Sequence, residues 1–296
     1  MYERVFAPLY SGAMATTPDP AGHPNLIAQA IAAGERACIL LDDSSGSTDP
    51  QYPQLEKGRK LWAGVALHPE AAKAVQQALR LSEMTNLINT GRKAVHFTEM
   101  VGRQGRYKDL PSDARIMIVE SLGDLLLQVN AYVCIFQMKP STVKSMQAAG
   151  HELWKVPGLD TSDPDSGALY NCLQVLKMHA FEASGYEGLV SAVADRWRGK
   201  EYKVLRPMKN GEDVDTWLWP RGIAFMSVEE FPMLQMADLV AWTYSRLELE
   251  SVRGIQNEYE EALIETLKRV SQGWRVSRPT PDGQFEFPTI SETVLP

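Results

Sequence analysis

The 296-residue sequence has few cysteines and no long hydrophobic run. Its three cysteines, Cys38, Cys134 and Cys172, lie far apart in the chain, each within an apolar segment. An odd number without paired spacing excludes a disulfide framework and predicts buried free thiols in a reducing compartment. No segment approaches the roughly 20 apolar residues that a membrane-spanning helix needs, and the N-terminus lacks the basic and apolar regions of a signal peptide. We therefore expect a cytoplasmic protein with no membrane partner.

Several signatures of known sites are also missing. The sequence contains no cysteine or histidine pairs with zinc-site spacing, no phosphate-binding P-loop and no Gly-x-Gly-x-x-Gly motif. Its five histidines are scattered, so we do not expect a histidine-rich metal site. The net charge is −7, from 30 basic and 37 acidic residues. Such a charge argues against non-specific coating of nucleic acid, but it allows a local basic groove.

The order of apolar segments predicts an α/β fold. Runs typical of strands cover residues 37–41, 61–67, 131–138 and 189–194, and segments typical of helices cover residues 69–87, 112–129, 232–249 and 257–270. Strands that alternate with helices in this way indicate a mixed sheet flanked by helices.

We also expect three regions along the chain. Residues 1–36 form an N-terminal extension with a short helix, residues 37–250 form the main domain, and residues 251–296 form a helix and a proline-rich tail packed on the same domain. Within the main domain we also expect a short extended piece at residues 93–97. A helix should follow the loop at residues 157–166 and end near residue 183. Two short strands are expected at residues 202–205 and 222–226.

Two of the predicted strands end in acidic residues. Asp42 and Asp43 follow the first strand, and Asp195 follows the strand over residues 189–194. Proteins of the α/β class place their sites at the C-terminal ends of strands. Because side chains alternate along a strand, only one of Asp42 and Asp43 shares a face with Cys38 and Leu40. A polar turn would use the same residue types, so that alternative stays open at each position.

Two further acidic residues lie outside the strands. Asp238 belongs to a segment, residues 233–242, that is apolar on nearly every side. Burial of an unpaired carboxylate costs several kcal/mol, so Asp238 should have a partner, either a divalent cation shared with other carboxylates, an arginine or a backbone amide. Glu99 follows His96 by three residues and either enters the same cleft or pairs with a helix dipole. His96 is either within reach of a scissile phosphate or an ordinary solvated or core histidine.

Together these acids form a possible set of metal ligands. Magnesium takes hard oxygen ligands and keeps several waters, so three or four carboxylates without histidine or cysteine suit it. Two such ions about 4 Å apart activate water and stabilise the leaving oxygen when a phosphodiester is cleaved. The expected ligands of Mg²⁺ or Mn²⁺, and the expected catalytic residues, are Asp42, Glu99, Asp195 and Asp238.

Basic residues flank two of these acids and predict nucleic acid, DNA or RNA, as the partner. Phosphates next to carboxylates would need neutralising, which these cations could do. A solvated charged face would show the same composition. The expected nucleic-acid-binding residues are Arg103 and Arg106 after Glu99, and Arg196, Arg198, Lys200 and Lys203 after Asp195.

The same positions resemble a known family. The run Asp42-Asp43-Ser44-Ser45-Gly46 resembles an Asp-Glu-Ser-Gly signature that follows a first strand, with Asp43 where the family often has Glu. His96-x-x-Glu99 resembles a His-x-x-Glu element, and residues 234–241 resemble the element Leu-Gln-x-Ala-Asp-x-x-Ala. The family is the bacterial and phage "domain of unknown function 3800", and the resemblance spans roughly residues 37–250.

The resemblance implies a ribonuclease H-like fold with a metal-dependent nuclease site. It implies that Asp42, Glu99 and Asp238 are the first-strand, second and helix carboxylates, whereas Asp195 is assigned by its position on a strand. The leading hypothesis is a nuclease that hydrolyses DNA or RNA, in phage defence or a mobile element. The alternatives are an inactive nucleic-acid-binding or assembly subunit with the same fold, and a metal-dependent hydrolase of a small phosphorylated molecule. The sequence gives no oligomeric state.

Overall fold

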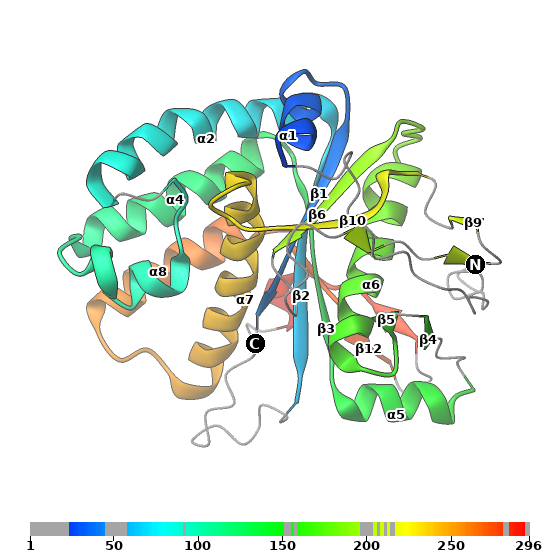
Figure 1. The fold of residues 1–296 in the computed structure, drawn as a ribbon. Coiled ribbons are helices and arrows are strands. Elements are labelled where there is room, and N and C mark those ends of the chain that lie inside the picture. The colour runs from blue at the N-terminus through cyan, green and yellow to red at the C-terminus, as the bar shows by residue number, and fades with distance from the viewer. Residues whose placement is uncertain are drawn as a thin grey trace.

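The computed structural model describes residues 24–44, 58–90, 93–150, 155–156, 159–195, 204–205, 208–209, 212–213, 217–280 and 284–293. In this part of the chain a mixed seven-strand sheet has helices packed against both faces (Figure 1). The predicted α/β class is therefore confirmed.

The sheet combines antiparallel and parallel pairs. In spatial order the strands are β11 (Arg275–Val276), β3 (Tyr132–Met138), β2 (Lys60–Leu67), β1 (Ala37–Ser44), β6 (Val190–Asp195), β10 (Leu218–Met226) and β7 (Val204–Leu205). Strand β2 runs antiparallel to β1 and β3, and β7 runs antiparallel to β10. Strand β6 runs parallel to β1 and β10, and β11 runs parallel to β3. The C-terminal ends of β1, β3, β6, β10 and β11 therefore lie at one edge.

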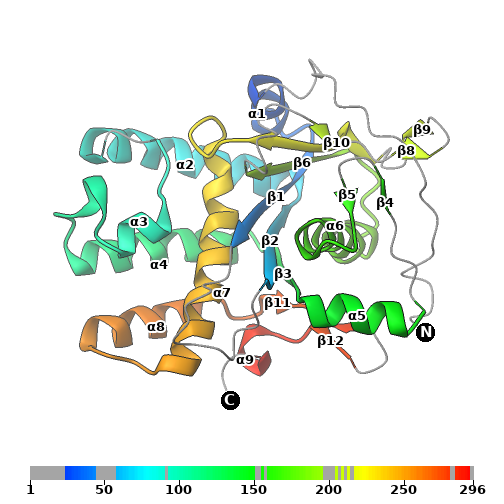
Figure 2. The ribbon, with the colours of Figure 1, turned by 60° about the horizontal axis from the view of Figure 1, so that its bottom comes forward.

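The sheet separates two hydrophobic cores (Figure 2). Along β1, Cys38 and Leu40 belong to the core on the side of α7, and Ile39 and Leu41 belong to the core on the side of α6. On the α7 side lie α1 (Pro24–Ala32), α2 (Pro69–Thr90), α3 (Phe97–Val101), η2 (Gly105–Tyr107), α4 (Ser112–Gln128), η4 (Pro232–Leu234), α7 (Gln235–Arg253) and α8 (Glu258–Val270). On the α6 side lie α5 (Pro140–Ala148), α6 (Pro164–Leu176) and the π-helix η3 (Lys177–Glu182).

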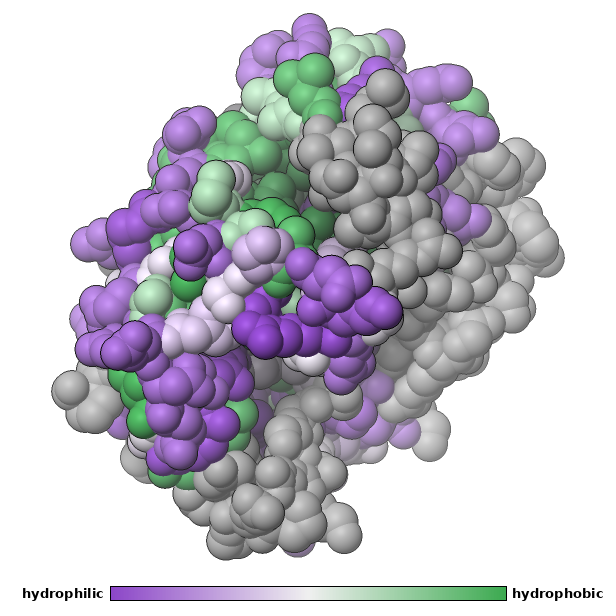
Figure 3. Space-filling view, turned by 90° about the vertical axis from the view of Figure 1, so that its left-hand side faces the viewer, coloured by the Kyte–Doolittle hydropathy of each residue, from purple (hydrophilic) through white to green (hydrophobic). Residues whose placement is uncertain are grey.

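The other described elements are short. They are the strand pairs β4 (Lys155–Val156) with β5 (Leu159–Asp160), β8 (Met208–Lys209) with β9 (Glu212–Asp213), and β12 (Arg278–Pro279) with β13 (Phe285–Glu286), and the helix α9 (Ile290–Thr293). No helix in the described part of the chain is long and apolar enough to cross a membrane. On the side of the molecule where α2 and α4 lie, hydrophobic residues show between hydrophilic ones (Figure 3), and Leu81 and Met117 are the most exposed of the large ones.

The structure agrees with several local predictions and differs from others. All three cysteines are buried and free, as predicted. The extended piece predicted over residues 93–97 ends one residue earlier, because the backbone of His96 is extended and α3 begins at Phe97. The tail, expected to wrap the surface, follows β11 and contributes the small β12–β13 sheet. Ile27 and Ile31 of α1 are buried in the core, and the domain boundaries after residues 36 and 250 stay predictions.

Candidate functional site

Strands β1 and β6 bring Asp42 and Asp195 to the same face of the sheet. Leu40 pairs with Val193 in the parallel register of these strands, and both belong to the core on the α7 side. Asp42 and Asp195 follow two residues later on their strands. Because side chains alternate along a strand, both aspartates are directed toward the α7 layer at the C-terminal edge of the sheet.

Helix α7 contributes Asp238 to the same place. It packs against β1 and β2, and its Ser245 Oγ lies 2.8 Å from Ser44 Oγ at the end of β1. The carboxylate of Asp238 is 20% exposed and accepts a long hydrogen bond of 3.4 Å from the backbone N–H of Phe97. His96 Nδ1 lies 3.9 Å from Asp238 Oδ2. A backbone amide, one of the partners that the sequence predicted, is therefore present.

The three aspartates share one electrostatic environment. Burial raises the pKa of Asp42 well above its ordinary value, and the carboxylates of Asp238, Asp195 and Asp43 raise it further. Burial also raises the pKa of Asp238 to about 6; His96 and the Phe97 N–H oppose this change, and Asp195 adds to it. Asp42 itself is only 9% exposed. Three of the four predicted carboxylates therefore lie close enough for charge on one to shift the pKa of another.

Glu99, the fourth predicted carboxylate, lies half-buried in α3, the helix that begins with Phe97. It is not among the groups that chiefly shift the pKa of Asp42 or Asp238. Its proposed role as a ligand therefore depends on the sequence motif.

The chemistry of these side chains suits a hard divalent cation. All the donors are carboxylate oxygens, and Mg²⁺ is commonly held by one or two carboxylates together with several waters. Within the described residues, however, no three His, Cys, Asp or Glu side chains are arranged so that they could hold a metal ion. The aspartates therefore fit an ion that takes few protein ligands, and they do not form a complete cage as they stand.

Asp43 lies on the opposite face of β1. Burial raises its pKa to about 6; Asp165 of α6 adds to this change, and Lys60 opposes it. Asp165 is itself buried and accepts a hydrogen bond of 3.0 Å from Trp62 Nε1. We did not predict this second acidic group from the sequence. Asp165 lies in the first turn of a helix after a proline, where an acidic residue is ordinary, so no local signal distinguishes it.

The predicted basic residues are only partly described. Arg103 is exposed in the turn after α3, at a φ of 52°, and its Nη2 donates to Ser112 Oγ at 3.1 Å. The Arg106 side chain and residues Arg196, Arg198, Lys200 and Lys203 lie outside what the structure describes. Their predicted contacts with nucleic acid stay predictions.

Comparisons with known proteins give no assignment. No protein-family model matches the chain, and no curated protein matches it either. The resemblance to the domain of unknown function 3800 therefore depends on the three motifs alone and stays a prediction.

Proposed function

We propose that this protein is a divalent-metal-dependent nuclease that hydrolyses phosphodiester bonds in DNA or RNA. The observation that carries the proposal is that Asp42 and Asp195 share one face at the C-terminal edge of the sheet and that Asp238 of α7 is near enough to shift the pKa of Asp42. Three neighbouring carboxylates in a partly dehydrated place repel one another unless a cation or bound protons compensate. Groups with strongly shifted pKa values are frequent at sites that perform chemistry.

The strand arrangement supports a ribonuclease H-like assignment of the fold. Strands β3, β2 and β1 form an antiparallel unit, and β1, β6 and β10 continue the sheet in parallel. Two of the three aspartates end adjacent parallel strands in the middle of this sheet, and the third comes from the helix that follows the last parallel strand. The sequence resemblance implies Asp42 and Asp238 as the first-strand and helix carboxylates, and Asp195 is assigned by its position on a strand.

Each residue has a chemical role in the proposal. A bound Mg²⁺ or Mn²⁺ would supply positive charge to the phosphate and lower the pKa of the attacking water. Asp42 and Asp195 would hold the ion from the sheet. Asp238 would hold it from α7, oriented by the Phe97 amide. His96 lies beside that carboxylate, with its Nδ1 3.9 Å from Asp238 Oδ2, and Glu99 is retained as a ligand on the motif alone.

A nuclease assay with a matched control tests the proposal. Labelled single- and double-stranded DNA and RNA are incubated with the protein in Mg²⁺, in Mn²⁺ or in excess chelator. Asp42→Asn and Asp238→Asn should reduce cutting to background. Asp43→Asn should keep the wild-type rate because its side chain faces the α6 layer. Cutting that persists in both site variants, or in chelator, would exclude the proposal.

A second candidate function is a catalytically inactive nucleic-acid-binding or assembly subunit. The absence of a ready-made group of three metal ligands among the described residues favours it. Calorimetric titration with MgCl₂ and MnCl₂ separates the two functions. Metal binding that is lost in Asp42→Asn supports the nuclease. If nucleic acid binds but millimolar metal does not, the result supports the subunit.

A further inference from the structure

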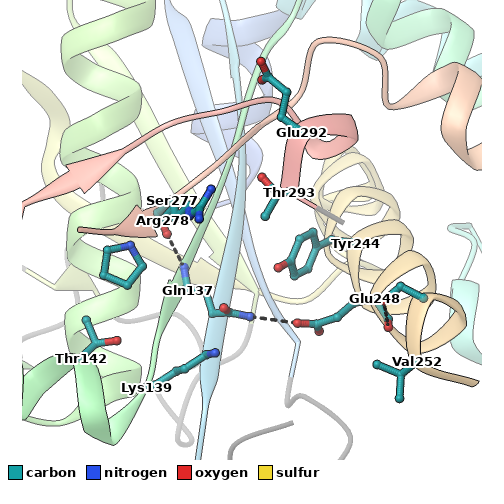
Figure 4. A pocket seen from close by; sticks show the side chains of 12 residues that line it. Gln137, Lys139, Thr142, Tyr244, Glu248, Val252, Ser277, Arg278, Glu292 and Thr293 are labelled. Carbon is teal, nitrogen blue, oxygen red and sulfur yellow. Dashed lines mark hydrogen bonds between the residues drawn. The ribbon is translucent and has the colours of Figure 1, made fainter. Parts of the chain in front are cut away.

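A pocket of about 510 Å³ opens near the same edge of the sheet (Figure 4). Gln137 of β3 and Lys139 contribute one wall, Tyr244 and Glu248 of α7 contribute another, and Arg278 of β12 contributes a third. Its volume lies within the range of about 300–1,000 Å³ that is usual for small-molecule sites. It is therefore large enough for one nucleotide.

The positive charge in the pocket comes from Lys139 and Arg278. Within the described part of the chain, neither side chain is within ion-pair distance of an acidic group. Glu292, an acidic residue of the lining, is already engaged, because it accepts hydrogen bonds from the Thr289 hydroxyl and backbone N–H at 2.7 and 2.6 Å. The two cations are thus available to an anionic ligand, and a phosphate is the group that such side chains bind well.

Glu248, the other acidic residue of the lining, is also engaged by the protein itself. Its Oε1 pairs with Arg59 and accepts from Gln137 Nε2 at 3.4 Å. Its Oε2 is buried, out of reach of the open space of the pocket. The positive charge of Lys139 and Arg278 is therefore left to a ligand.

The pocket also offers apolar surface and lies along the same helix as the aspartates. Val252 and Pro279 line it beside the charged groups, whereas Tyr244 is almost fully buried, so the apolar part of the lining suits the sugar of a nucleotide. Asp238 and Glu248 are ten residues apart on α7, or about 15 Å along the helix axis. A stacked nucleic-acid strand covers this distance with about four nucleotides, at about 3.4 Å each.

We propose that this pocket binds one nucleotide of a nucleic-acid strand, with Lys139 and Arg278 on its phosphate. The proposal rests on the proposed function, because it takes the bound strand to be the one that reaches Asp42 and Asp238. It assigns to the pocket a role in holding the strand, away from the bond that is cut.

Binding measurements in excess EDTA, where no cutting occurs, test this proposal. The probes are adenosine 5′-monophosphate, titrated by calorimetry, and labelled eight-nucleotide oligoadenylates of DNA and RNA, followed by fluorescence anisotropy. Lys139→Ala and Arg278→Ala should each weaken binding of both kinds of probe by about tenfold, since each removes a charge-assisted hydrogen bond. Each should also reduce the slope of log Kd against log salt for the oligonucleotides by about one.

Lys144→Ala is the matched control, because Lys144 is an exposed lysine on α5 outside the pocket lining. It should bind as the wild type does, and Lys139→Arg should largely restore affinity, which a folding defect would not allow. Adenosine 5′-monophosphate should compete with the oligonucleotide. The proposal is overturned if all variants bind alike, if 5 mM nucleotide does not bind, or if nucleotide binds without competing.

The two proposals fail separately. Cutting that persists in Asp42→Asn and Asp238→Asn removes the proposed nuclease and leaves the EDTA binding data unaffected. Metal-dependent cutting together with unchanged binding in Lys139→Ala and Arg278→Ala removes the nucleotide pocket alone.

Discussion

The metal-free protein should lose stability as the pH rises, and Asp238 allows this loss to be measured. Burial raises the pKa of Asp238 from 3.8 to about 6, in a site that also contains His96, Asp195 and Asp42. An acid with a raised pKa holds its proton more tightly in the native state. Its contribution to stability is therefore complete below about pH 4 and is lost as the pH rises through about 6.

The magnitude follows from the same values. A pKa raised from 3.8 to about 6 corresponds to about 3 kcal/mol, of which about 2 kcal/mol is lost between about pH 4.5 and pH 7.5. Asp238→Asn removes this titration and keeps the shape of the side chain. Between these two pH values the free energy of unfolding of the variant should therefore rise by about 2 kcal/mol relative to that of the wild type.

Urea unfolding in excess EDTA at both pH values measures this difference. In thermal unfolding, the same change should move Tm by roughly 4 °C for a chain of this size. Asp109→Asn, at an exposed position, is the control, and the change with pH should be larger for Asp238→Asn than for this variant. If the difference in free energy of unfolding between Asp238→Asn and the wild type changes no more with pH than that of the control, burial of Asp238 does not stabilise its protonated form as we derive.

Addition of Mg²⁺ at pH 7.5 should restore part of the stability that the metal-free protein loses as the pH rises. A ligand that binds only the native state stabilises it by about 1.4 kcal/mol at ten times its Kd. We expect this gain in the wild type and in Asp43→Asn, and much less in Asp238→Asn, because Asp238 belongs to the proposed metal site and Asp43 does not. An equal gain in all three proteins would place the ion elsewhere.

Two further predictions concern packing and ion pairs. Gly123→Ala should destabilise the protein by about 1–3 kcal/mol in urea unfolding, because the added methyl group overlaps Val270 where α4 packs on α8. A change below about 0.5 kcal/mol, as is usual for surface substitutions, would contradict this cause. Glu260→Gln should cost about 2 kcal/mol, because Arg246 and Arg253 both donate to Glu260. Burial by itself would raise the pKa of Glu260. The hydrogen bonds that Glu260 accepts, of which the one from Arg253 has the largest effect, outweigh burial and lower the pKa. The loss should therefore shrink below about pH 4.5, and a loss that does not change with pH would contradict the ion-pair interpretation.

The central strands could be predicted because their apolar runs are unbroken. Residues 61–67, 131–138 and 189–194 were expected as strands, and β2, β3 and β6 have these bounds to within a residue. A strand covered by helices on both faces needs apolar side chains in both directions. That requirement leaves a signal in the sequence that does not depend on the rest of the fold.

Elements whose existence depends on distant partners could not be predicted. Helix α5 begins at Pro140, directly after β3, and the sequence analysis assigned no element there. Strand β11 has only two residues, and its pairing with β3, across more than a hundred residues, defines it. Helix α6 was expected to continue to residue 183, but the backbone changes to a π-helix at Lys177, and residue periodicity does not encode that change.

For the candidate site, too, the local sequence predicts one feature, and contacts between distant segments decide the rest. Alternation along β1 predicts that only one of Asp42 and Asp43 shares a face with Leu40, and the structure confirms that this residue is Asp42. Alternation does not predict which helices cover the face that carries Asp42. The parallel pairing of β1 with β6 and the packing of α7 decide this, and they make Asp195 and Asp238 neighbours of Asp42. Asp42 and Asp43 both have raised pKa values, but their side chains lie on opposite faces of the sheet. If the proposed site performs the reaction, Asp42→Asn should abolish cutting and Asp43→Asn should not. If the number of acidic groups at this edge is what matters, the two variants should behave alike.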